Sequence, residues 1–208
     1  MTRVSGSNTP RIQSTQPARQ QPEPVQTAQA EATPQRVQLH SRDTFETGNP
    51  GLDAINAAQL LPGRDHTCVT TVRANLQRAG LQGLPSTTSQ DGNNPRGMMV
   101  QMLQSGHWHS AAIPGATQRA ITSPYGTVQA QVLSGDAYMA AARDGQIPEG
   151  SVVFQTRHPA GWAYGGGSRG SDVGIVRDGG IFNYRQFSGM SVYGNNLSEV
   201  VVLQPGAR

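Results

Sequence analysis

Residues 63–80, GRDHTCVTTVRANLQRAG, hold the only cysteine of the chain and its clearest helix signal. The apolar residues recur at intervals of 3, 4 and 3, which places them on one helix face: Val69, Val72, Leu76 and Ala79. Asp65 or Thr67 can cap the start of this helix, and Gly80 can close its end. Cys68 therefore lies in the first turn of a predicted helix.

The segments around this helix predict an α+β domain. Apolar spacing indicates further helices within residues 48–63, 94–105 and 135–146. The C-terminal third contains short β-rich runs separated by turns, at 150–157, 172–179, 180–187 and 199–205, and two more strands are expected within 107–115 and 126–135. RDGG at 177–180 is typical of a tight hairpin. Helices followed by a meander predict an antiparallel sheet.

Composition divides the chain into two parts. Residues 1–48 are rich in Gln, Pro, Ser, Thr and Arg, and they contain too little apolar surface to offset the entropy lost on ordering. We therefore expect a disordered tail at 1–48 and a folded domain at 49–208. The tail is either a plain linker or a segment read by an export machine or an adaptor.

Charge and hydropathy exclude several classes of protein. The net charge is only +3 and no run of arginines forms a stripe, so no nucleic-acid partner is expected. No apolar stretch approaches the length of a membrane span, and the N-terminus lacks the apolar segment of a Sec signal peptide. The expected location is the cytoplasm until export, then secretion or delivery to a periplasm or target cell. No cysteine or histidine cluster has zinc spacing, so neither a metal nor a cofactor is expected.

Cys68 has two interpretations. Free cysteine is among the most frequently buried residue types, which favours a structural role. A helix N-terminus, however, offers unpaired N–H groups and the positive end of the dipole, and both favour a reactive thiolate. The nucleophilic interpretation requires a base, usually histidine, and a group that orients the base.

His158 is the preferred base. If residues 150–157 and 172–178 pair as antiparallel neighbours, the end of one strand lies beside the start of the next, and His158 comes close to Asp172. A carboxylate there would fix the imidazole tautomer. His107 and His109 are the alternatives. The glycine-rich loop 158–171 would form a wall of the substrate groove, with Trp162 and Tyr164 as substrate-contacting or packing residues.

DHTCVTTVRANLQRAG, IPEGSVVFQ and SDVGIVRDGGIFNY together resemble the papain-like NlpC/P60 and CHAP superfamily, over roughly residues 60–190. The resemblance implies a papain-like fold in which Cys68 is the nucleophile. It also implies that Asp172 occupies the position where the family has its catalytic histidine, and that Asn183 falls near the third polar position. Three outcomes stay open: His158 supplies the imidazole, His107 or His109 supplies it, or the site is inactive.

The function implied by the resemblance is that of a bacterial cysteine hydrolase. It would cleave an amide bond of peptidoglycan through a Cys68 acyl-enzyme, as a secreted effector or lytic enzyme. Two alternatives remain. One is a papain-like binding module without catalysis, and the other is an effector that modifies a host or competitor protein as a protease, deamidase or transglutaminase.

Overall fold

The fold is given by a computed structural model, which describes residues 46–63, 67–86, 94–163 and 170–206. The described residues belong to one compact unit. Most of the predicted tail and Tyr164 lie outside these ranges.

Four α-helices occur in the described residues: α1 (Pro50–Ala57), α2 (Cys68–Arg78), α3 (Pro95–Gln104) and α4 (Gly135–Arg143). The starts of α1, α3 and α4 are capped by side-chain oxygens of Asn49, Asn94 and Ser134. Gly80 follows the end of α2 with φ 77°, a conformation that favours glycine, and this confirms the predicted stop. Short 3₁₀ turns occur at Gly161–Ala163 and Gly194–Asn196.

Eight strands form an antiparallel sheet. They are β1 (Trp108–Ser110), β2 (Thr117–Ser123), β3 (Gly126–Ser134), β4 (Val152–Thr156), β5 (Ser171–Arg177), β6 (Gly180–Phe182), β7 (Gln186–Phe187) and β8 (Glu199–Pro205). Their order is β2-β3-β8-β4-β5-β6-β7, with β1 paired to β8. The last strand in sequence is therefore central, between β3 and β4.

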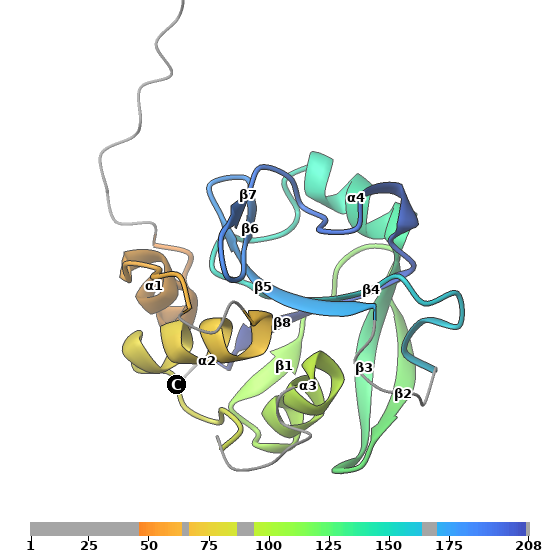
Figure 1. Cartoon of the computed structure of the whole chain (residues 1–208), viewed down its shortest axis with the longest axis horizontal. Coiled ribbons are helices and arrows are strands. Elements are labelled where there is room, and N and C mark those ends of the chain that lie inside the picture. Colours follow the sequence, from red (N-terminus) through yellow and green to blue (C-terminus); the bar gives the residue numbers. More distant parts are fainter. Residues whose placement is uncertain (1–45, 64–66, 87–93, 164–169, 207–208) are drawn as a thin grey trace, which may run out of the picture. The chain divides into compact units, whose positions relative to one another are not determined.

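The sheet separates two apolar cores, because successive side chains of a strand point to opposite faces. Phe154 of β4 and Leu203 of β8 pack with α2 and α3, whereas Val153 and Val202 pack with α4. Figure 1 shows the same layering, with α2 and α3 on one side of the central strands and α4 on the other. The first core holds α2 against β5, which places the start of α2 beside the start of that strand.

The structure confirms the predicted α+β class with an antiparallel sheet. The RDGG hairpin is also confirmed, since Asp178 and Gly179 both have positive φ and Arg177 pairs with Gly180. The sequence analysis did not predict strand β2. It also placed one strand at 180–187, where the structure has the two short strands β6 and β7 separated by a turn around Asn183.

Gly174 allows β5 and β6 to approach closely, which supplies a test of the sheet. A Cβ atom at this position would lie 2.1 Å from Ile181 Cγ2. We expect Gly174→Ala to lower the free energy of unfolding by about 1–3 kcal/mol, the usual cost of overpacking a core. Urea denaturation measures this difference. Gly189→Ala is the control, because its Cβ would meet no atom within 4 Å. An unchanged midpoint for Gly174→Ala would contradict the close packing of β5 on β6.

Candidate functional site

Cys68 is the first residue of α2, as predicted, and its side chain is partly buried. Thr67 is the N-cap, but its hydroxyl is paired with Thr70 and makes no capping hydrogen bond. The backbone N–H groups of Val69 and Val173 both interact with the Cys68 sulfur, and each lowers the pKa of the thiol. The sulfur therefore has two donors from two different elements, the first turn of α2 and strand β5.

Asp172 lies against Cys68, and Asn183 holds it. Asn183 Nδ2 donates to Asp172 Oδ1 at 3.0 Å, and the Asn183 side chain is fully buried. Asn183 Oδ1 in turn accepts from the N–H of Tyr184 at 2.5 Å, so the amide is fixed at both ends. The three positions singled out by the resemblance, Cys68, Asp172 and Asn183, are thus brought together from α2, β5 and the end of β6.

The charge state of this group follows from burial. Desolvation, followed by the negative charge of Asp172, raises the pKa of the Cys68 thiol to about 12. Desolvation also raises the pKa of Asp172, while the hydrogen bonds from Asn183, Val173 and Cys68 act in the opposite direction. At neutral pH the sulfur therefore carries its proton and lies beside a partly buried carboxyl group.

Gln155 and Tyr193 extend the site on the side of β4. Gln155 is buried and is the register partner of Asp172. Its amide holds the segment before Tyr193, since Nε2 donates to Met190 O at 2.7 Å and Oε1 accepts from Val192 N–H at 3.0 Å. Burial and the charges of Asp172 and Cys68 raise the pKa of Tyr193, so this phenol stays protonated beside them.

The sequence analysis missed both Gln155 and Tyr193. Gln155 does have a signal in the sequence, since it directly follows the apolar run VVF. A polar side chain on a buried strand needs hydrogen-bond partners, so a single amide at this place deserved notice. Tyr193 had no comparable signal. It reaches the site through the long connection between β7 and β8, whose path depends on tertiary contacts.

His158 follows β4, one strand away from Asp172, as the hairpin argument expected. Asp172, however, is the register partner of Gln155, three residues earlier. His158 Nδ1 accepts from the N–H of Ala160 at 3.2 Å, which ties the imidazole to its own turn. Among the groups of the described residues that shift the pKa of Cys68 or Asp172, His158 does not occur. The structure thus brings Asp172 to Cys68 without His158.

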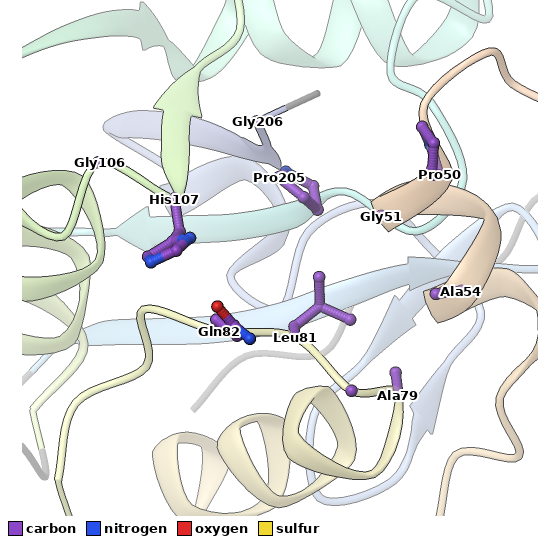
Figure 2. A pocket seen from close by; sticks show the side chains of 11 residues that line it. Pro50, Gly51, Ala54, Ala79, Leu81, Gln82, Gly106, His107, Pro205 and Gly206 are labelled. Atoms are coloured by element: carbon purple, nitrogen blue, oxygen red, sulfur yellow. The ribbon is translucent and has the colours of Figure 1, made fainter. Parts of the chain in front are cut away.

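His107 lies in a different part of the molecule. It lines a cavity of about 340 Å³, together with Leu81 beyond the end of α2 and Pro205 at the end of β8 (Figure 2). Cys68 is at the opposite end of α2, and a helix of 11 residues is about 16 Å long. His107 is therefore not placed beside the thiol.

His109 is also remote from the site. It is exposed on β1, which pairs with β8, and β4 lies between β8 and β5. Three strand spacings separate it from Asp172, about 14 Å at roughly 4.8 Å each. Neither alternative histidine is brought to the nucleophile.

Trp162 lies in the core rather than along a groove. It is 4 % exposed and packs in the apolar cluster that also contains Phe154 and Val173. Its backbone N–H donates to Glu199 Oε2 at 2.8 Å, and Glu199 also forms an ion pair with Arg119. The first part of the loop after β4 is therefore anchored to β8.

Within the described ranges, no group of three or more His, Cys, Asp or Glu side chains is arranged to hold a metal ion. None of the helices in those ranges has the length and hydropathy required to cross a membrane.

Comparison of the chain with protein-family models, with curated proteins and with solved structures finds no match.

The site predicts an unusual response of the thiol to substitution. We expect Asp172→Asn to lower the pKa of Cys68, because it removes a negative charge beside the sulfur while burial still disfavours the thiolate. At a fixed pH near 8, alkylation by iodoacetamide should then be about tenfold faster for each unit of pKa decrease. Since Cys68 is the only cysteine, mass spectrometry of the whole chain reports on this residue alone.

Asp178→Asn is the matched control for that measurement, because Asp178 is exposed in the turn between β5 and β6. Its alkylation rate should equal that of the unmodified protein. A rate for Asp172→Asn that is equal to or slower than the control would contradict the contact between Asp172 and Cys68.

Proposed function

We propose that this domain is a cysteine hydrolase that cleaves amide bonds, with Cys68 as nucleophile and Asp172 as its proton acceptor. The observation that supports this proposal is the placement of a partly buried carboxyl group between the thiol and the Asn183 amide. Burying a charged group is costly unless it is paired, and such arrangements are concentrated at functional sites.

The high pKa of Cys68 is compatible with this role because the thiol and the carboxyl group share one proton. The thiol pKa of about 12 is raised in part by the Asp172 charge. When the proton moves from sulfur to Asp172, that repulsion disappears, and the N–H groups of Val69 and Val173 remain to stabilise the thiolate. Because burial raises the pKa of Asp172, this carboxylate is also a stronger base than an exposed one.

The proposed reaction then follows in two halves. The thiol proton passes to Asp172 while the sulfur attacks the amide carbon, and the carbonyl electron pair moves onto oxygen. The C–N bond breaks as Asp172 returns the proton to the departing nitrogen, which leaves a thioester on Cys68. Water attacks the thioester, its proton passes through Asp172 to the sulfur, and the acid is released. Backbone N–H groups at the start of α2, including that of Cys68, would stabilise the oxyanion.

The substrate and setting in this proposal come from the resemblance to NlpC/P60 and CHAP enzymes. A papain-like fold is consistent with a nucleophile at the start of α2 and with β5 and β6 supplying the next two polar positions. The proposed substrate is the peptide portion of peptidoglycan. The proposed setting is a bacterial secreted effector or lytic enzyme.

A second candidate is a papain-like binding module without turnover. The protonated state of Cys68 favours it, as does the lack of a histidine among the described groups that act on the sulfur. In this alternative the surface around Cys68 binds a peptide without cleaving it, and the thiol is one of its polar contacts.

The first prediction from the proposal concerns Cys68 and Asp172 together. Incubation of purified peptidoglycan with the protein should release soluble fragments, measured by mass spectrometry. Cys68→Ala should reduce the rate at least about 10³-fold through loss of the nucleophile, and Asp172→Asn about 10²- to 10⁴-fold through loss of the base. Asp172→Asn would thus be more reactive toward iodoacetamide and less active as an enzyme. Full activity of Cys68→Ala would contradict the assignment of the nucleophile.

The second prediction concerns pH. Asp172 must be ionised to accept the proton, and its pKa is raised by burial, so activity should fall on acidification with a midpoint above the ordinary carboxyl value of about 3.9. Asp172→His should move that midpoint toward about 6.5, the ordinary value of imidazole. If the unmodified protein is inactive at every pH and Asp172→His releases fragments, the natural chain is a binding module and not a hydrolase.

A further inference from the structure

Two arginines lie in the segments next to the strands around Asp172, one directly after β4 and one in the turn after β6. Arg157 is the first residue after β4, two residues beyond Gln155, and its N–H donates to Gly170 O at 2.8 Å. Its guanidinium lies over the Tyr193 ring, and the Tyr193 phenol interacts with the charges of Asp172 and Cys68, so Arg157 lies on the side of the site that Tyr193 occupies. Its side-chain stem runs along Gly170, where an added Cβ atom would come within 3.2 Å of Arg157 Cγ.

Arg185 lies on the other side and is connected to Asp172 through Asn183. The Asn183 side chain donates to Asp172 and also accepts from the N–H of Arg185 at 3.4 Å, while Arg185 O accepts from Asn183 N–H. The residue that orients the carboxyl group therefore also fixes the turn that carries the second arginine.

Both guanidinium groups are stacked on aromatic rings. Arg157 lies over the Tyr193 ring at 5.6 Å, and Arg185 lies over Phe187 at 4.7 Å and over Tyr184 at 5.5 Å. In the part of the chain that the structure describes, the ion pair is formed by Arg119 and Glu199 and involves neither of these arginines. Both side chains are exposed. Stacking restricts the guanidinium plane while its edge remains able to bind an anion.

Their charges do not serve to neutralise Asp172. The pKa of Asp172 is shifted by burial and by hydrogen bonds from Asn183, Val173 and Cys68, and neither arginine is among the causes. Arg157 does act on Tyr193, whose phenol lies near both Cys68 and Asp172. Arg157 is thus linked to the nucleophile through Tyr193, and Arg185 through the turn that Asn183 holds, and neither cation neutralises the protein's own carboxylate.

We propose that Arg157 and Arg185 bind carboxylate groups of the substrate on either side of the bond that Cys68 attacks, so that the site selects acidic peptides. This inference rests on the proposed function, in that both place a peptide across Cys68. Arginine suits the task because its planar guanidinium matches a carboxylate with two parallel hydrogen bonds. The peptides of peptidoglycan carry free carboxylates beside their amide bonds, and a chemically amidated peptide would lack them.

Binding to the Cys68→Ala protein tests the inference without turnover. The probes are a synthetic stem tetrapeptide of peptidoglycan and the same peptide with its carboxylates amidated, titrated by calorimetry against the full chain. We expect the acidic peptide to bind at least tenfold more tightly. Arg157→Gln and Arg185→Gln should each weaken its binding several-fold and leave the amidated peptide unaffected. Arg143→Gln, at an exposed arginine in the last turn of α4, is the charge-matched control.

The outcomes separate this inference from the proposed function. Three results would overturn the arginine assignment. The two peptides could bind equally, neither peptide could bind, or Arg143→Gln could weaken binding as much as Arg157→Gln and Arg185→Gln do. Selective binding together with an unmodified protein that never releases fragments would support the arginines and reject the hydrolase. Fragment release with a KM that is the same for Arg157→Gln, Arg185→Gln and the unmodified protein would support the hydrolase and reject the arginines.

Discussion

The antiparallel pairing of β4 with β5 is the constraint on which the candidate site depends. It sets Gln155 opposite Asp172, and from these two residues the rest of the site follows. Gln155 secures the segment that leads to Tyr193, while Asp172 meets the thiol at the start of α2. A shift of one residue between β4 and β5 would place Gln155 and Asp172 on opposite faces of the sheet.

Burial of Cys68 beside Asp172 explains why the pKa of the thiol is raised. A helix N-terminus by itself would favour a thiolate, and the sequence analysis emphasised that effect. In the folded chain, desolvation and a neighbouring carboxylate outweigh the two N–H groups that act in the opposite sense. The consequence is one proton held between sulfur and carboxyl group, in place of the thiolate and imidazolium that a histidine would give. A carboxylate beside the thiol thus gives a different resting state from the one that an imidazole would give.

The features predicted correctly from the sequence are those whose conformation is decided by neighbouring residues in the chain. Gly80 and the RDGG turn were recognised because their conformations are dictated by their own residues, and the central strands were recognised from their β-branched runs. Strand β2 was missed because Ile121 is its only fully buried large apolar residue, so its alternation is weak. The placement of His158 beside Asp172 assumed that β4 continues to His158. The strand ends at Thr156, and the imidazole is tied into the following turn.

The three positions indicated by the family resemblance lie together in the structure, although position 172 holds aspartate where the resemblance implies histidine. Cys68, Asp172 and Asn183 are separated by 104 and 11 residues in sequence, and their convergence depends on α2 packing against β5 and on β6 pairing with β5. Spacing alone does not encode either contact. The sequence does place an amide, Asn183, at a position that becomes buried. A buried amide needs hydrogen-bond partners, and Asn183 finds them in the Asp172 carboxyl group and the backbone of the next turn. The buried Asn183 amide orients the Asp172 carboxylate toward the thiol whether or not the protein is an enzyme. Both proposals therefore depend on this carboxylate rather than on any histidine of the described residues.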